Sequence, residues 1–134
     1  MEILIRRAKL ADTADIRKLI GHYAREKRLL PRQAEEIKKA YRNFFVAVCD
    51  GTLIGCVALE IYSKKLAEIR SLAVNRHWKG LNIGSALIQV CLARAKSRRI
   101  AEVMAITSSE KFFEKQGFSF ALPNEKKALF YWTK

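Results

Sequence analysis

The dipeptide Asp50-Gly51 constrains the fold of this chain more than any other feature. It separates two runs, residues 43–49 and 52–61, that are rich in valine, isoleucine, leucine and phenylalanine. Asp-Gly between two such runs is a strong signal for a two-residue hairpin turn, because both turn residues adopt positive φ angles there. We therefore expect an antiparallel hairpin in the middle of the chain.

The hydrophobic periodicity on either side of the hairpin predicts further helices and strands. Ile16, Leu19, Ile20 and Tyr23 recur at the i, i+3, i+4, i+7 spacing of an amphipathic helix, which Asp12 can cap. In chain order, the expected elements are a strand at 2–7, helices from Asp12 and at 33–42, the hairpin, a strand at 67–74, a helix at 84–98, a strand at 102–106, a helix at 110–116, and closing segments around Phe118 and 129–132 that complete the sheet. This order predicts an α/β (α+β) fold, a mixed sheet with helices on both faces.

Length and composition favour one folded domain over residues 1–134. Half of the residues are apolar, so a continuous core is available and global disorder is not expected. No apolar run approaches the roughly 18–20 residues that a membrane-spanning helix needs. The start of the chain contains an acidic residue and is unlike a secretory signal. We therefore expect a cytoplasmic protein without a membrane partner.

The net charge of +13, from 26 basic and 13 acidic residues, attracts polyanions. Three interpretations are open: a solvated basic surface, steering of an anionic cofactor, and nucleic-acid binding. The sequence has no helix-turn-helix glycine turn, RNA-binding aromatic signature or zinc-ligand spacing. Nucleic acid is therefore the least favoured of the three.

The cysteines Cys49, Cys56 and Cys91 are odd in number and lack metal-ligand spacing. A two-residue turn pairs Cys49 with Thr52 and places Cys56 near Phe45, so the two thiols of the hairpin do not face each other. We expect three buried, reduced cysteines and no metal site.

The segment 71–85 has the pattern of a strand, a glycine-containing loop and a helix start. The first amide N–H groups of a helix lack partners within the helix and carry partial positive charge, so such a turn is suited to a phosphate or pyrophosphate. Gly80 and Gly84 let the backbone approach a ligand, and Asn82 tolerates left-handed geometry. An ordinary connection between a strand and a helix explains the pattern equally well.

Two motifs resemble those of the GCN5-related N-acetyltransferase (GNAT) superfamily. Residues 79–84, Lys-Gly-Leu-Asn-Ile-Gly, are similar to its pyrophosphate-binding pattern, Arg/Gln-x-x-Gly-x-Gly/Ala, with Lys79 and Asn82 as departures. Residues 111–118, Lys-Phe-Phe-Glu-Lys-Gln-Gly-Phe, resemble its short aromatic helix that ends in Gly-Phe. The resemblance implies the GNAT fold, with strands that splay apart at an acetyl-CoA site, and acetyl-CoA as the co-substrate.

The likeness is closest to the acetyltransferase domain of bacterial N-acetylglutamate synthases. It covers nearly the whole chain and rests on segments 29–32, 55–59, 67–74 and 122–127. It implies direct transfer of an acetyl group to the α-amine of L-glutamate, and a place in arginine biosynthesis. Long members of that family carry an amino-acid-kinase-like domain ahead of this one. This chain lacks it, so arginine feedback is not expected.

The resemblance also assigns roles at the cofactor site. The amides of residues 72–74 hold the acetyl carbonyl and the pantetheine arm, and the loop at 79–85 holds the pyrophosphate. Phe112 and Phe113 pack near the thioester end, although aromatic residues of a core need no such role. The residues expected to bind acetyl-CoA are Leu72, Ala73, Val74, Lys79, Gly80, Leu81, Asn82, Ile83, Gly84, Ser85, Phe112 and Phe113.

Glu68 and Ser109 are the expected catalytic residues. A carboxylate at Glu68 can accept the proton of the acceptor ammonium, directly or through water; it can equally be a strand glutamate paired with a neighbouring cation. Many superfamily members place a proton-donating tyrosine at the position of Phe113, so the resemblance transfers that role to Ser109 or to a water. Ser109 can also be the N-cap of a helix. His22 and His77 are weaker candidates.

The expected substrate site consists of Arg32, Arg70 and Lys134. The guanidinium of Arg32 can hold a carboxylate with two charge-assisted hydrogen bonds; it can also be one more solvated cation. The synthase family has an arginine at the position of Lys134 and then continues. The expected acceptor is an anionic amino acid. Protein or peptide amines, other small amines, and a basic binding protein on the same fold are alternatives. The chain is expected to be a monomer or a homodimer.

Overall fold

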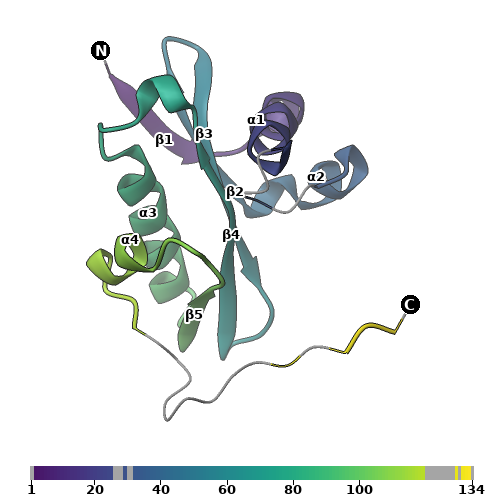
Figure 1. The fold of residues 1–134 in the computed structure, drawn as a ribbon, viewed down its shortest axis with the longest axis vertical. Coiled ribbons are helices and arrows are strands. Elements are labelled where there is room, and N and C mark those ends of the chain that lie inside the picture. Colours follow the sequence, from purple (N-terminus) through teal and green to yellow (C-terminus); the bar gives the residue numbers. More distant parts are fainter. Residues whose placement is uncertain (1, 26–28, 30–31, 120–128, 130, 134) are drawn as a thin grey trace.

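The computed structural model describes residues 2–25, 29, 32–119, 129 and 131–133 (Figure 1). The strands are β1 (Ile3–Arg7), β2 (Phe44–Cys49), β3 (Thr52–Ile61), β4 (Leu66–Val74) and β5 (Glu102–Ala105). The helices are α1 (Thr13–Arg25), α2 (Ala34–Ala40), α3 (Ile83–Ser97) and α4 (Glu110–Lys115). The expected order of elements is confirmed as far as α4, with shifts of one or two residues at the ends.

The described strands form one open sheet in the order β1-β2-β3-β4-β5 (Figure 1). Neighbouring strands are antiparallel, except that β4 and β5 are parallel and are connected through α3. The hairpin turn is confirmed: Asp50 and Gly51 have φ angles of 50° and 77°, and Cys49 pairs with Thr52. A mixed, mostly antiparallel sheet is therefore the observed fold class.

The predicted neighbour of Cys56 is wrong. The register between β2 and β3 shifts at an extra residue of β3, Ile54, so that Cys56 pairs with Val46 and not with Phe45. A β-bulge of this kind moves every later pair by one residue. The alternation of apolar residues along the strand does not reveal it, because β3 is almost wholly buried on both faces.

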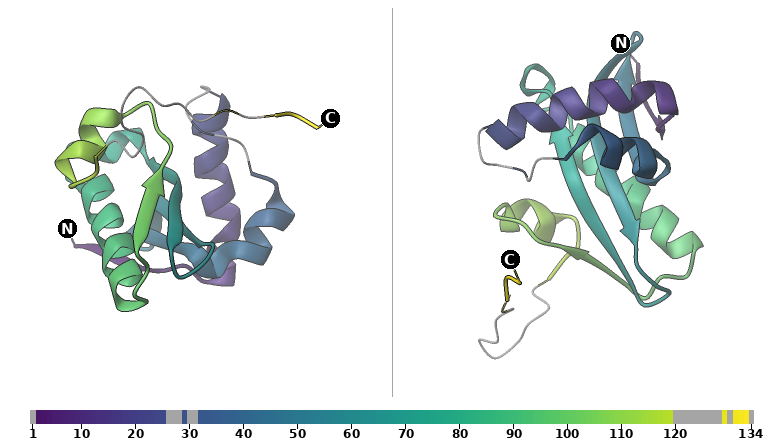
Figure 2. Two further views of the ribbon diagram at one scale, coloured as in Figure 1. Left: turned by 90° about the horizontal axis from the view of Figure 1, so that it is seen from below. Right: turned by 90° about the vertical axis from the view of Figure 1, so that its right-hand side faces the viewer.

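Helices cover both faces of the sheet, with α1 and α2 on one side and α3 and α4 on the other (Figure 2). Each side has its own apolar core. The core under α1 and α2 contains Ile16, Ile20, Ile37, Phe44 and Cys56. The core under α3 and α4 contains Cys49, Leu59, Leu87, Cys91 and Phe113. The three cysteines are buried free thiols, and burial raises the pKa of Cys56 and of Cys91 to about 12.

Asp12 does not cap α1 as predicted. It ends a short 3₁₀ turn, Leu10–Asp12, and α1 begins after it at Thr13. The carboxylate accepts the backbone N–H of Lys9 at 2.7 Å and pairs with the Arg6 guanidinium at 2.8 Å. The Arg6 hydrogen bond lowers the pKa of Asp12. The side chain therefore holds the end of β1 against the start of the helix.

The predicted closing strands are not formed by the described residues 118–119, 129 and 131–133. Phe118 instead completes the end of α4: Gly117 has a φ of 101°, and the N–H of Phe118 bonds the carbonyl of Phe113 at 3.1 Å. Leu129, Tyr131 and Trp132 are largely exposed. Their composition favours strands, but a strand also needs a hydrogen-bonded partner. No helix among the described residues is long and apolar enough to cross a membrane.

Candidate active site

A bulge in β4 interrupts its pairing with β3 near the middle of both strands. Cys56 pairs with Ala73 and Ala58 pairs with Arg70, so two residues of β4 lie opposite one residue of β3. Ser71, the first of the two, has a φ of 57°. Bulges bend a strand and re-aim its neighbours, and here the bend falls immediately before the residues expected to hold the acetyl group.

The other edge of β4, which faces β5, also lacks a partner strand near the bulge. β5 pairs with β4 over Leu66–Ile69 only, and no described strand pairs with β4 on that side beyond Ile69. The backbone of residues 70–74 therefore borders a gap between β4 and β5, with amide groups available on that edge. One of these groups is taken by α1, because the Tyr23 hydroxyl donates to the carbonyl of Val74. The remaining edge fits an extended ligand that hydrogen-bonds like a strand.

The loop after β4 ends in backbone geometry that suits an anion. Gly80 and Asn82 have φ angles of 86° and 58°, so the chain turns sharply before α3 begins at Ile83. Asn82 makes no side-chain cap bond, and the first hydrogen bond of the helix runs from the Ala86 N–H to the Asn82 carbonyl. The amides of residues 83–85 are therefore open to a ligand at the positive end of a 15-residue helix. This arrangement fits a pyrophosphate.

The two glycines of the loop differ in what requires them. Gly80 needs its positive φ, and a Cβ added there would meet nothing within 4 Å. Gly84 has ordinary helical geometry, but an added Cβ would lie 3.4 Å from Cζ of Phe112. The missing side chain at Gly84 thus leaves room for α4. Lys79 lies with its ammonium 5.3 Å from the ring centre of Tyr23, which ties the loop to α1.

The aromatic residues of α4 are part of the core. Phe113 is buried and makes edge-to-face contacts with Phe112 and Phe118, at centroid distances of 5.3 and 5.2 Å. Ser109 occupies the N-cap position of α4, but its hydroxyl makes no cap bond. Its backbone N–H donates to Oγ1 of Thr107 at 2.8 Å. The Ser109 hydroxyl is thus exposed and not committed to the helix.

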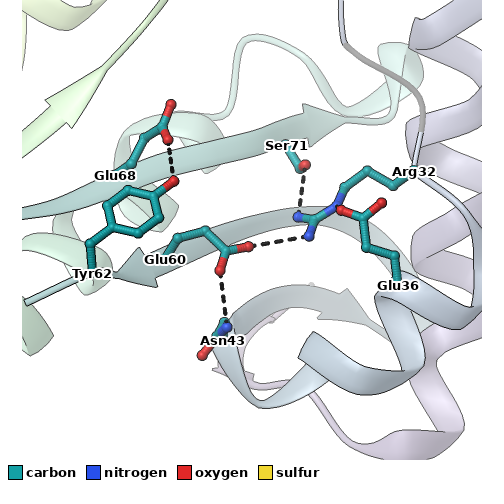
Figure 3. A network of polar contacts seen from close by, with 7 residues as sticks. All are labelled: Arg32, Glu36, Asn43, Glu60, Tyr62, Glu68 and Ser71. Carbon is teal, nitrogen blue, oxygen red and sulfur yellow. Dashed lines mark hydrogen bonds and ion pairs between the residues drawn. The ribbon is translucent and has the colours of Figure 1, made fainter. Parts of the chain in front are cut away.

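A polar cluster lies on the face of the sheet that carries α1 and α2 (Figure 3). Glu60 of β3 and Glu68 of β4 are directly paired across the strands, and residues in that relation point to the same face. The Tyr62 hydroxyl donates to Oε1 of Glu68 at 2.6 Å. That hydrogen bond, with burial and the charge of Glu68, raises the pKa of Tyr62 to about 12. The phenol therefore remains a donor to the carboxylate at any physiological pH.

Arg32 joins this cluster from the start of α2. Its side chain is 3% exposed, which rules out the alternative of a solvated cation. Nε bonds Glu36 at 2.7 Å, Nη2 bonds Glu60 at 3.2 Å, and Nη1 lies 3.4 Å from Oγ of Ser71. The guanidinium also stacks over Phe44, 5.4 Å from the ring centre. The structure thus brings Arg32 beside the β4 bulge, as a substrate role requires.

Several of these partners were not among the expected site residues: Glu36, Asn43, Glu60 and Tyr62. Asn43 donates to Oε2 of Glu60 at 3.2 Å and so fixes that carboxylate from the side opposite Arg32. The i, i+4 spacing of Arg32 and Glu36 is a signal in the sequence that could have identified one pair. The partnership with Glu60 depends on how α2 docks on the sheet, and no local pattern encodes that.

The remaining expected residues are placed as follows. Arg70 is half-buried on β4, and its charge acts on the Tyr62 phenol, so it belongs to the same cluster. Lys134 and the segment 122–127 lie outside the described residues. His22 contacts Arg76 at 2.8 Å, and the backbone N–H of His77 donates to Oδ1 of Asn75. Within the described ranges, no group of three or more His, Cys, Asp or Glu side chains could hold a metal ion.

Comparisons of the sequence with known proteins identify a family. The sequence model of the acetyltransferase (GNAT) family matches residues 10–118. An uncharacterized N-acetyltransferase of Chlorobaculum tepidum is 39% identical over 114 residues, which are 85% of this chain and 74% of the relative. An amino-acid acetyltransferase of Mycobacterium tuberculosis is 32% identical over 119 residues, 87% of this chain and 68% of the relative.

A solved structure extends the comparison to the ligand. N-acetylglutamate synthase of Neisseria gonorrhoeae, complexed with coenzyme A and N-acetyl-glutamate, aligns with a TM-score of 0.85 and 26% identity. The alignment covers 94% of this chain and 30% of the gonococcal one. The chain belongs to the GNAT family, as an N-acetyltransferase that uses acetyl-CoA.

Proposed function

We propose that the protein transfers the acetyl group directly to the α-amine of an anionic amino acid, with L-glutamate as the leading candidate. The observation that carries the proposal is the position of Arg32. Its guanidinium lies 3.4 Å from Ser71, the residue that precedes the acetyl-binding amides in β4. A carboxylate held by Arg32 would leave the amine of the same small molecule close to the thioester.

At the cofactor site, acetyl-CoA supplies a reactive thioester, and the chain supplies binding and orientation. The open amides of residues 83–85 would hold the pyrophosphate, with Lys79 adding charge. The β4 edge would align the pantetheine arm, and an amide within residues 72–74 would donate to the carbonyl as negative charge develops on its oxygen. In other enzymes one such donor contributes roughly 2.7–4 kcal/mol.

Two residues are assigned to proton movement, Glu68 of β4 and Ser109 at the start of α4. Glu68 would accept a proton from the acceptor ammonium, so that the amine becomes nucleophilic. Tyr62 would keep that carboxylate in position through its hydrogen bond of 2.6 Å. Ser109, whose hydroxyl makes no cap bond, or a water would return a proton to the departing thiolate. Phe113 cannot do so, because its ring has no proton to donate and lies in the core.

The charge of the cluster is consistent with an acceptor that carries both signs. Glu60 and Glu68 are paired across the strands beside Arg32, so the site offers carboxylates to an ammonium as well as a guanidinium to a carboxylate. An amino acid with its ammonium toward Glu68 and a carboxylate toward Arg32 satisfies both. A peptide amine would use the acidic part alone, which makes it the second candidate acceptor.

A function of another class, binding of a polyanion, is favoured by a single feature. A groove of about 640 Å³ is lined by α1 and the start of α2, including Arg17, Lys18, Arg25 and Arg32. Nucleic-acid binding through this groove would weaken steeply with salt. Turnover of acetyl-CoA that does not depend on added nucleic acid would leave the groove as a solvated basic surface.

The test of the proposed function follows thiol release from acetyl-CoA with glutamate, aspartate, glutamine and a basic peptide. The matched variant is Arg32→Lys, which keeps a cation for Glu60 but loses the planar fork. We expect its KM for glutamate to rise about tenfold, the worth of one charge-assisted hydrogen bond, with the peptide unaffected. Wild-type enzyme that acetylates the peptide and ignores all three amino acids would refute the proposed acceptor class.

A further inference from the structure

We infer that Glu36 is an internal competitor for the acceptor carboxylate, so that it determines which acceptors the enzyme takes. The inference rests on the proposed function, in which Arg32 binds that carboxylate. It identifies Glu36 as a specificity residue that the acceptor has to displace.

The guanidinium of Arg32 has protein partners on all three of its nitrogens. Nε bonds Glu36, Nη2 bonds Glu60, and Nη1 lies near the Ser71 hydroxyl (Figure 3). Its flat face is covered by Phe44. A carboxylate that grips arginine in the bidentate manner needs two neighbouring N–H groups. These partners use three of the five N–H groups of the guanidinium. An acceptor carboxylate that takes the edge formed by Nε and Nη2 can bind both nitrogens only if a glutamate moves away.

Glu60 is not the one that moves. Its side chain is 16% exposed, and its second oxygen accepts from Asn43 at 3.2 Å. It lies within β3, where pairing with Glu68 of β4 holds the backbone. Displacing it would leave a nearly buried carboxylate without its cation, which is strongly unfavourable.

Glu36 can leave at little cost. Its side chain is 44% exposed, and Arg32 is its partner across one helical turn. Within the described part of the chain, no other hydrogen bond or ion pair holds the Glu36 carboxylate. Rotation about its side-chain bonds brings the charge into water. The Nε edge of Arg32 is then free for an incoming carboxylate, which replaces Glu36 charge for charge.

Such an exchange favours ionised acceptors over neutral ones. A carboxylate offers Arg32 the same interaction that Glu36 gives up, whereas an amide offers a neutral and weaker one. Acceptors without a suitably placed carboxylate leave the Glu36 pair intact. They form no ion pair with Arg32, so the Glu36–Arg32 pair makes their binding weaker than that of ionised acceptors.

The experiment compares Glu36→Gln with wild type in steady-state acetylation of L-glutamate and of its two monoamides, L-glutamine and L-isoglutamine. The variant keeps the shape of the side chain and removes the competing charge. We expect the KM for glutamate to fall about threefold to fivefold, the strength of a half-exposed ion pair. The KM for acetyl-CoA and kcat should stay within experimental error. The monoamide that lacks the carboxylate bound by Arg32 should show no improvement, which identifies that carboxylate.

Glu35→Gln is the matched control. Glu35 precedes Glu36 on α2, is 79% exposed, and has a loose pair with Lys38 at 3.9 Å. The Glu35→Gln variant loses the same charge without any change at Arg32, so its KM for glutamate should equal that of wild type. Equal effects in the two variants would mean general electrostatics and would overturn the inference, as would an unchanged or raised KM in Glu36→Gln. If wild type shows no turnover of any acidic amino acid, the proposed acceptor fails first and this inference falls with it.

Discussion

Removal of Arg32 should destabilise the fold, and removal of Glu60 in the same protein should restore part of the loss. Arg32→Ala leaves Glu60 16% exposed with one amide donor, from Asn43, in place of a guanidinium. Breaking a buried pair by deleting one partner costs about 3–5 kcal/mol. We take the lower end, about 3 kcal/mol, because Glu60 keeps that donor and some contact with water. A loss of this size lowers the melting temperature of a domain of this length by roughly 10 °C.

The assay is urea unfolding of wild type, Arg32→Ala, Glu60→Gln and the double variant at neutral pH. In the double variant no charge is left buried without a partner, so we expect it to be more stable than Arg32→Ala by about 1–2 kcal/mol. The slope of free energy against urea should stay the same in all four proteins. Arg32→Ala within 1 kcal/mol of wild type, or a double variant no better than the single one, would refute the buried network.

This result also decides how the kinetics of Arg32 variants are interpreted. A raised KM in Arg32→Ala alone can come from a collapsed pocket as easily as from a lost contact with substrate. If the double variant regains stability and the KM for glutamate stays high, the lost interaction is the one with the acceptor. If the KM recovers together with stability, Arg32 acts by holding α2 on the sheet.

Three further outcomes test the remaining parts of the site and fold. Gly84→Val should weaken acetyl-CoA binding tenfold or more in calorimetry, about one charge-assisted hydrogen bond, while Gly21→Ala in α1 should leave the affinity as in wild type. Glu68→Gln should lower kcat by about 10²–10⁴ with acetyl-CoA affinity unchanged; a loss under about threefold would mean that the carboxylate is structural. Arg6 lowers the pKa of Asp12, so its stabilisation, about 1 kcal/mol, exists above the unfolded pKa of about 3.9 and disappears as pH falls through the lower folded value. Asp12→Ala should therefore be less stable than wild type at pH 7, and by a steadily smaller margin as the pH falls below about 4; a difference that does not depend on pH would contradict the ion pair.

The backbone geometry of the loop before α3 could be predicted from the sequence because it depends on local residue types. Gly80 and Asn82 do adopt positive φ angles, and α3 begins within one residue of the predicted start. A glycine or asparagine at such a position restricts the backbone whatever the rest of the chain does. The hairpin at Asp50-Gly51 was predictable for the same reason.

The bulge at Ser71 was not predictable in that way. Serine at a φ of 57° is uncommon, and no residue type in the segment signals it. The bulge appears only when β3 pairs with β4, two residues against one. The same holds for Arg32: the sequence left open a carboxylate-binding residue or a solvated cation, and the docking of α2 made it a buried ion pair. Tertiary pairing decides both, and these are the features that shape the acceptor side.

The strong positive charge of the chain and the acidic acceptor cluster act over different distances. A net charge of +13 raises the local concentration of an anionic donor such as acetyl-CoA, but mobile ions screen it beyond about 8–10 Å in water. Within the cluster the neighbours matter more, since Glu60 and Glu68 are paired across the strands and Glu60 bonds the buried Arg32 guanidinium. In the proposed function, the global field brings in the donor, while the local charges would orient the acceptor, with its ammonium toward Glu68 and its carboxylate toward Arg32. A basic protein is thereby compatible with a site that selects a zwitterion.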